Sequence, residues 1–151
     1  MIAGDIYDKA VPSAEAMEVL DGFIEELTQN LPELVIMMIS GNHDSAVRVN
    51  CYRSVLARQR LHMIGLPPVQ PEEYIEKVVL RDAYGSVNFY LLPFVKPSMV
   101  KLITGTDEKG IICLMMRRCD GCSQGKRLIW RSGTCWSVTS FIFRQEKMQK
   151  K

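Results

Sequence analysis

Histidine is scarce in this 151-residue chain, which has only two, and long apolar runs are absent. The longest apolar stretches, residues 34–39 and 89–95, fall far short of the roughly 20 residues that a membrane-spanning helix needs. The first residues have no basic segment followed by an apolar one, so they predict no export. A composition of 47% hydrophobic and 24% charged residues is that of a globular domain or part of one. We expect a cytoplasmic chain without a membrane segment.

Acidic and basic residues are divided unevenly along the chain. Residues 1–110 contain 10 Lys and Arg against 15 Asp and Glu, whereas residues 111–151 contain 9 against 2. Most of the cysteines also lie in the second part, at Cys113, Cys119, Cys122 and Cys135. We therefore expect a partial domain over residues 1–110 and a separate, irregular tail over residues 111–151.

Apolar patterning in the first part alternates between strands and helices. Residues 1–5 form a short apolar run, and residues 34–40 form a continuous one, which is typical of a strand buried on both faces of a parallel sheet. Between them, residues 13–30 have the periodicity of an amphipathic helix, with apolar residues at Met17, Leu20, Ile24 and Leu27. This order predicts a parallel βαβ unit.

The following residues extend this unit. A second helix is expected from Asp44 or Ser45 to about Gln59, followed by a short strand over residues 61–65. Residues 74–95 have the pattern of a β-hairpin with a Gly-containing turn. The predicted fold class is therefore α/β, an incomplete sandwich with a parallel βαβ core and an added β-hairpin.

Polar side chains follow the first two predicted strands, with Asp5 after one and Asn42 and His43 after the other. Open α/β sheets build their sites at the carboxyl ends of such strands. Carboxylate, amide oxygen and imidazole suit Mn, Mg, Fe or Zn, and paired cations activate water and hold a phosphoryl oxygen. The local chemistry predicts a metal-dependent phosphoesterase.

Two short blocks make a resemblance specific. GDIYD at residues 4–8 and GNHD at residues 41–44 resemble the second and third signature blocks of calcineurin-like metallophosphoesterases. Three further stretches, SGNHDSAVR, LHMIG and VNFYLLPFVKP, are similar to the SbcD-like nucleases of that superfamily, and the likeness extends to about residue 110. It implies a Mn²⁺-dependent DNA exonuclease and endonuclease of double-strand-break repair and recombination, with two Mn²⁺ per complete site. It also implies an SbcC-type ATPase partner and a homodimer within the complex.

The same resemblance implies roles for individual residues. Asp5 would bridge the two metals and Asn42 would bind the second one. His43 would bind no metal but would protonate the leaving oxygen or stabilise the transition state, and Asp44 would orient His43. Asp8 is expected behind the metal ligands rather than among them.

Other polar residues are assigned no role in the site. Tyr7 is expected to pack, and His62 is expected to be a hydrogen-bonded histidine of a strand. The four arginines between residues 48 and 60 fit either a phosphate-binding face or a solvated helix face.

The resemblance also calls for residues that the chain does not contain. An Asp-x-His block would precede Gly4, and histidines after residue 110 would complete both metals, yet the tail has none. We therefore expect a fragment that keeps few of the metal ligands and is catalytically inactive alone.

The tail admits two explanations. Read as protein, its four cysteines offer the thiols of a structural zinc site, although only Cys119 and Cys122 form a close pair. The other explanation is a shift of reading frame near residue 110. Re-read with permitted codon choices, the segment gives an acidic amphipathic helix and an apolar strand that ends in Ser-His. We favour the shift because it explains the charge, the cysteines and the missing histidine together.

Two other functions remain as alternatives. Within the same fold, the chain could belong to another calcineurin-like phosphatase or phosphodiesterase, although the sequence of residues 87–97 argues for the nuclease. From another class, it could be a noncatalytic, Cys-rich metal-binding module, which would bind one zinc through thiolates.

Overall fold

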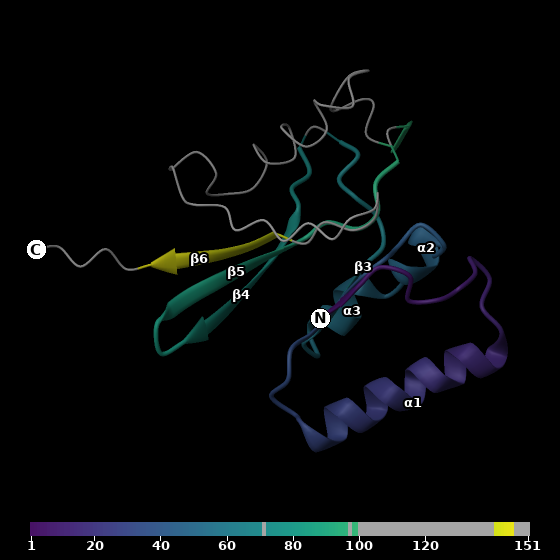
Figure 1. Ribbon diagram of the computed structural model, residues 1–151, viewed down its shortest axis with the longest axis horizontal. Coiled ribbons are helices and arrows are strands. Elements are labelled where there is room, and N and C mark those ends of the chain that lie inside the picture. The colour runs from purple at the N-terminus through teal and green to yellow at the C-terminus, as the bar shows by residue number, and fades with distance from the viewer. Residues whose placement is uncertain (71, 97, 100–140, 147–151) are drawn as a thin grey trace, which may run out of the picture.

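The computed structural model describes residues 1–70, 72–96, 98–99 and 141–146 (Figure 1). Its helices are α1 (Ala14–Asn30), α2 (Ala46–Val49) and α3 (Arg53–Ala57). One sheet contains β1 (Ile2–Ala3), β2 (Ile36–Ile39) and β3 (Leu61–Ile64), and the other contains β4 (Glu76–Asp82), β5 (Gly85–Leu91) and β6 (Phe141–Glu146). The expected mixed α/β fold is confirmed.

The first sheet is parallel, with the strands in the order β1, β2, β3. Ile2 lies opposite Met38, and Ile36 lies opposite Leu61. All four residues of β2 are buried, as expected for the central strand of a parallel sheet covered on both faces. The carboxyl ends of β1 and β2 therefore lie side by side.

Helix α1 begins where the sequence predicts. Ser13 is its N-cap, and the Ser13 hydroxyl accepts a hydrogen bond from the backbone N–H of Ala16 at 3.3 Å. Leu20, Ile24 and Leu27 pack against the parallel sheet, but Met17 is 51% exposed, so the buried stripe begins one turn later than the periodicity predicts. None of the helices in the described ranges is long and apolar enough to cross a bilayer.

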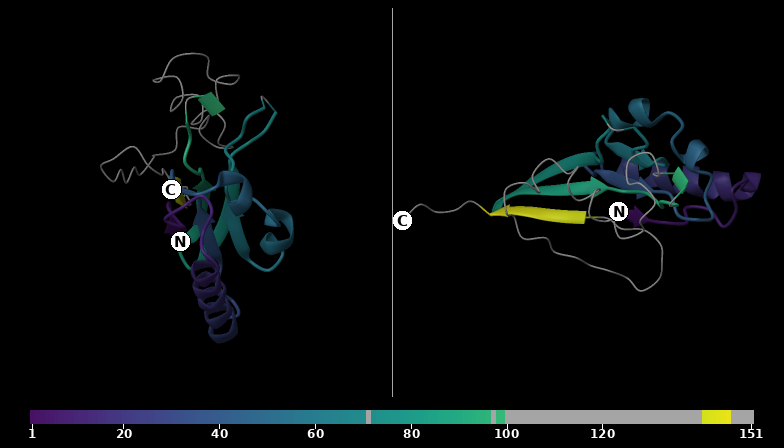
Figure 2. Two further views of the ribbon diagram at one scale, coloured as in Figure 1. Left: turned by 90° about the vertical axis from the view of Figure 1, so that its right-hand side faces the viewer. Right: turned by 90° about the horizontal axis from the view of Figure 1, so that it is seen from above.

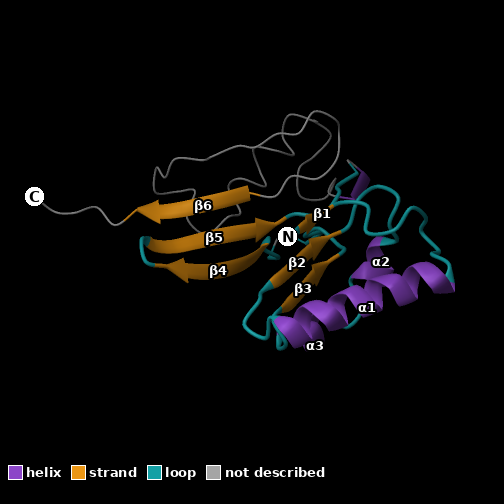
Figure 3. Ribbon diagram, turned by 60° about the horizontal axis from the view of Figure 1, so that its bottom comes forward, coloured by secondary structure: helices purple, strands orange, loops and turns teal. Residues whose placement is uncertain are grey.

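Side chains of β2 alternate between two apolar layers. Ile36 and Met38 face the side that Leu20 and the rest of α1 cover, whereas Met37 and Ile39 face the β4–β5 hairpin. Figure 3 shows α1 along the parallel strands and the second sheet beside them. The parallel sheet thus forms the middle of a sandwich, with helices on one face and the hairpin on the other.

The segment after β2 differs from the single helix that we expect over residues 45–59. It forms the two short helices α2 and α3, separated at Tyr52, whose backbone has φ 58°. A left-handed residue cannot continue an α-helix, so the chain turns there. The side-chain oxygen of Asn50 accepts the N–H of Gly65 at 3.2 Å and ties this turn to the end of β3.

The hairpin and its third strand form the antiparallel sheet. Strands β4 and β5 pair as expected, from Glu76 opposite Leu91 to Asp82 opposite Gly85. Residues 141–146, which we expect to be irregular, instead form β6 along the other side of β5 (Figure 2). A strand edge offers unpaired backbone groups to any β-forming segment, and Phe-Ile-Phe has the composition of one. The rest of the tail lies outside the described residues.

Candidate functional site

The parallel pairing of β1 and β2 brings the two signature blocks together. The backbone N–H of Gly4 donates to the carbonyl of Ile39 at 3.1 Å and continues the ladder past β1. One residue later, Asp5 Oδ1 accepts the backbone N–H of His43 at 3.1 Å. The prediction that Asp5 lies beside the Asn42–His43 loop at one edge of the sheet is therefore confirmed.

Gly41 permits this close approach. It is buried, and a Cβ built on it would overlap both the backbone nitrogen and the side-chain oxygen Oδ1 of Asp5. Any side chain at this position would separate the loops. The glycine of the GNHD block is thus required by the packing of one loop on the other.

Asp5 and Asn42 offer oxygen atoms to solvent at this edge. Both residues are exposed, and among the described residues no hydrogen bond is recorded for Asp5 Oδ2 or for the Asn42 side-chain amide. Carboxylate and amide oxygens are donors that Mn²⁺ accepts. The two residues fit a metal site as part of its ligand set. Within the described ranges, no group of three His, Cys, Asp or Glu side chains could hold a metal ion.

His43 is oriented by a backbone carbonyl. Its Nδ1 lies 3.2 Å from the carbonyl oxygen of Asp8, and the ring is exposed. A carbonyl oxygen can only accept, so Nδ1 carries the proton in this contact and Nε2 remains open to solvent. Asp8 thus contacts His43 through its main chain, and its expected place behind the metal ligands stays a prediction.

Asp44 has different partners from the one that the sequence predicts. Its carboxylate accepts the backbone N–H groups of Ile6, Tyr7 and Gly41 at 2.8–2.9 Å. No hydrogen bond joins Asp44 to the ring of His43, and the contact that fixes the ring is made by the Asp8 carbonyl instead. The physical reason is that three backbone donors converge on one half-buried carboxylate, which satisfies them together.

Tyr7 lies beside this carboxylate. The residue is half-buried, and its backbone N–H donates to Asp44, so its expected role as a packing aromatic stays a prediction. Burial raises the pKa of the Tyr7 hydroxyl, and the charges of Asp44 and Asp21 raise that pKa further. The hydroxyl therefore stays protonated at neutral pH.

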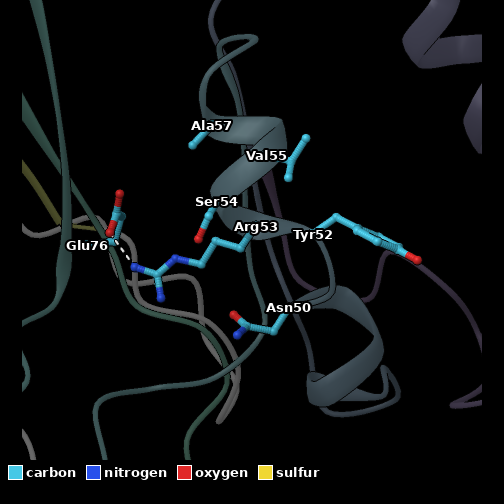
Figure 4. Close-up of a pocket in the computed structure, with 7 residues that line it drawn as sticks. All are labelled: Asn50, Tyr52, Arg53, Ser54, Val55, Ala57 and Glu76. Carbon is cyan, nitrogen blue, oxygen red and sulfur yellow. Dashed lines mark hydrogen bonds and ion pairs between the residues drawn. The ribbon is translucent and has the colours of Figure 1, made fainter.

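A second polar cluster lies away from the edge, around a cavity of about 580 Å³ between α3 and β4 (Figure 4). Arg53 and Glu76 form an ion pair across it. His62 lies near this pair, on β3. Its Nδ1 is buried and has no hydrogen-bond partner among the described residues. The prediction that His62 is a hydrogen-bonded histidine is therefore wrong for Nδ1. Burial lowers the pKa of His62, although Glu76 opposes the shift.

Sequence reasoning identified the side chains of the edge but missed its backbone donors. The N–H groups of Ile6, Tyr7 and Gly41 leave no trace in residue type. The only available signal was the pair of glycines at residues 4 and 41, which marks loops that approach closely. The four cysteines of the tail and the expected frame shift lie outside the described residues.

The layering around this edge defines the class of protein. A parallel βαβ sheet has helices on one face and an antiparallel hairpin on the other, and its polar edge holds the GDIYD and GNHD blocks. The chain is part of a metallophosphoesterase-like sandwich.

Comparison with known proteins narrows this class. No family model matches the chain. The SbcD subunit of the nuclease SbcCD from Staphylococcus epidermidis is 36% identical over 101 residues, which are 67% of this chain and 25% of that protein. The SbcD subunit from Rhodobacter capsulatus is 30% identical over 103 residues, with 64% and 25% covered. The chain thus spans about a quarter of the length of the curated relatives that it matches, and the matched part is similar to a segment of their SbcD subunits.

Proposed function

We propose that this chain is a fragment of a Mn²⁺-dependent DNA nuclease that acts in the cytoplasm in double-strand-break repair and recombination. The proposal is carried by one contact, in which the N–H of His43 donates to Asp5 Oδ1 and joins the two signature blocks at one edge. The likeness to SbcD nucleases supports the same chemistry.

The residues of this edge would have different roles in DNA cleavage. Asp5 Oδ2 and the Asn42 amide oxygen would hold Mn²⁺, which in such sites supplies activated water and neutralises charge on the phosphate. His43, held through Nδ1 by the carbonyl of Asp8, presents Nε2 to solvent. In its protonated form it would donate from Nε2 to the departing oxygen of the DNA strand.

The proposed partners follow from the relatives, whose names describe one of the subunits of SbcCD. We propose an SbcC-type ATPase as the partner protein and a second copy of the nuclease chain within the complex. DNA is the proposed substrate, and its phosphates would approach the exposed edge at Asp5 and Asn42.

A chimera tests the function with a complete nuclease. The matching 101-residue stretch of the Staphylococcus epidermidis SbcD protein would be replaced by its counterpart from this chain. We expect Mn²⁺-dependent cleavage of a linear DNA duplex by the chimera. We also expect loss of cleavage in its Asp5→Ala form and a drop of about 10²- to 10⁴-fold in its His43→Ala form.

Circular dichroism would show that the chimera is folded. A folded chimera without DNA cleavage would contradict the nuclease proposal. Hydrolysis of small phosphate esters without cleavage of DNA would favour the phosphatase alternative. A Glu18→Ala form, changed at an exposed position of α1, is the matched control and should cleave like the parent chimera.

We propose further that the 151-residue chain is inactive alone. Two oxygen-donating side chains leave most coordination positions of a metal pair to water, so the cations would be held weakly. The second histidine of the chain cannot add a ligand at the edge, because His62 lies between the sheets. Incubation of the chain with Mn²⁺ and a linear duplex tests this, and cleavage that disappears in Asp5→Ala would contradict it.

A further inference from the structure

The carboxylate of Asp44 is committed to backbone donors. Oδ2 accepts the N–H groups of Ile6 at 2.9 Å and Gly41 at 2.8 Å, and Oδ1 accepts the N–H of Tyr7 at 2.8 Å. A carboxylate offers about four acceptor positions, so these bonds use most of them. Ile6 and Tyr7 belong to the loop after β1, whereas Asp44 belongs to the loop after β2. Asp44 therefore fastens one loop to the other.

The loop that Asp44 holds has an unfavourable backbone. Gly4 has φ 96° and Asp5 has φ 34°. Positive φ is unfavourable for a residue with a Cβ and persists where the surrounding structure holds it. Ile6 and Tyr7, whose N–H groups bind Asp44, follow Asp5 directly. The hydrogen bonds are thus placed to hold the strained turn at Asp5.

The two loops hold each other reciprocally. While Asp44 accepts donors from the Asp5 loop, Asp5 Oδ1 accepts the N–H of His43 from the Asp44 loop. Among the described residues, no hydrogen bond is recorded for the other oxygen, Asp5 Oδ2.

We propose that Asp44 is a positioning residue that holds Asp5 in the conformation presenting its carboxylate beside Asn42. It acts through the backbone and contacts neither the ring of His43 nor a cation. Its charge is part of this role, because hydrogen bonds to an ionised carboxylate are shorter and stronger than those to a neutral amide. The inference rests on the proposed function only where it concerns the cation.

Two backgrounds at residue 5 test the strained turn without any metal. Asp5→Gly and Asp5→Ala both remove the carboxylate, but only alanine keeps the Cβ that makes positive φ unfavourable. We expect Asp44→Ala to lower the midpoint of urea unfolding less in the alanine background than in the glycine background, because release of the turn relieves strain that only alanine has. Equal shifts in the two backgrounds would overturn the proposal. If a variant with Asp44→Ala does not fold, Asp44→Asn replaces it in both backgrounds.

Mn²⁺ binding by the full chain tests the consequence for the edge. Paramagnetic broadening of the Asn42 side-chain amide in NMR spectra reports the bound ion. We expect Asp44→Asn to raise the apparent Kd for Mn²⁺ by about 10- to 100-fold, the usual effect of losing a group that supports a ligand. Asp82→Asn is the matched control, since Asp82 also accepts a backbone N–H, that of Tyr84 at 2.8 Å in the hairpin turn. That variant should bind Mn²⁺ like the parent.

The outcomes separate this inference from the proposed function. An unchanged Kd in Asp44→Asn, in a chain that binds Mn²⁺, would overturn the positioning role. If the parent chain shows no Mn²⁺-dependent broadening at Asn42, the metal proposal fails. The comparison of the glycine and alanine backgrounds then still decides whether Asp44 holds the turn at Asp5.

Discussion

The carboxylates of Asp5 and Asp44 at the carboxyl edge of the parallel sheet have hydrogen-bond partners, whereas, in the described ranges, a polar group in the layer between the two sheets does not have one at every atom. At the edge, within the part of the chain that the structure describes, Asp44 has three backbone partners and Asp5 has one. Between the sheets, His62 Nδ1 has none among the described residues. Loops at a sheet edge can bend until donors meet acceptors, whereas a strand position is fixed by its register. Polar side chains are therefore more easily supplied with hydrogen-bond partners at strand ends than between two sheets.

Of the changes considered, truncation of the buried apolar side chain beneath the edge should lower the stability most. Ile39 is 0% exposed and directly precedes the loop of the GNHD block. Ile39→Ala should lower the free energy of unfolding by about 2–5 kcal/mol, because it removes buried methyl groups and leaves a cavity. Urea unfolding followed by circular dichroism measures this change.

The control for this substitution is Val79→Ala on β4, where the side chain is 45% exposed. Its cost should stay within about 0.5 kcal/mol. Similar costs for the two variants would show that Ile39 does not support the edge as described.

Separating the two loops should have the second largest effect on stability. Gly41→Ala introduces a Cβ that overlaps Asp5, so the loops must separate. We expect a loss of about 1–3 kcal/mol in unfolding free energy, the usual cost of overpacking. Gly22→Ala in α1 is the control, since its Cβ meets nothing within 4 Å. That change should instead stabilise the chain by about 0.5–1 kcal/mol. A neutral Gly41→Ala would show that the loops do not need to touch.

Removing His62 Nδ1, which has no hydrogen-bond partner in the described ranges, should increase stability instead of lowering it. His62→Phe keeps a planar ring between the sheets and removes the buried polar atom. We expect the unfolding free energy at pH 7 to rise by about 1 kcal/mol, because an unpaired buried group destabilises the folded state. Urea unfolding measures it. A clear loss of stability would instead indicate that His62 has a partner that stabilises the fold.

The pH dependence of stability should be the smallest effect. Burial holds the pKa of His62 below its usual value of 6.5, with Glu76 opposing the shift and Arg53 adding to it. Above pH 6.5, His62 is neutral in both the folded and the unfolded chain, so its protonation does not reduce the stability. As the pH falls below 6.5, the unfolded chain takes up the proton first, so stability decreases until the folded pKa is reached.

Urea midpoints between pH 7.5 and about 5 measure this decrease, and the parent chain is compared with His62→Phe. The part of the decrease that His62 causes should be missing from the variant, which still contains His43. Identical pH profiles for the two proteins would contradict the assignment.

Much of the edge could be predicted because the pattern that marks its residues lies next to them in the sequence. An apolar run followed by Gly-Asp or Gly-Asn-His is visible in the chain, and parallel pairing then brings Asp5 and His43 together. The partners of Asp44 could not be predicted in this way. The choice between the His43 ring and backbone donors depends on the path of the loop, and that path depends on a positive φ at Asp5.

The segment of residues 45–59 shows the same limit. It contains neither Gly nor Pro, so no residue type marks the break between α2 and α3. The left-handed residue there is Tyr52, which is 79% exposed. A tertiary contact, the hydrogen bond from Gly65 to Asn50, holds the turn, and local propensity does not encode such contacts.

Two kinds of contact hold the loop that carries Asp5 against the rest of the sheet: the pairing of β1 with β2 and the backbone hydrogen bonds to Asp44. Local opening would break these contacts and leave the remaining pairs of the sheet formed. Such local openings have free energies well below that of global unfolding. A cation that needs Asp5 beside Asn42 then binds with an affinity reduced by the fraction of molecules in which this strand is docked. The same cation, by mass action, raises that fraction. Occupancy of the edge and docking of the first strand are therefore one linked equilibrium.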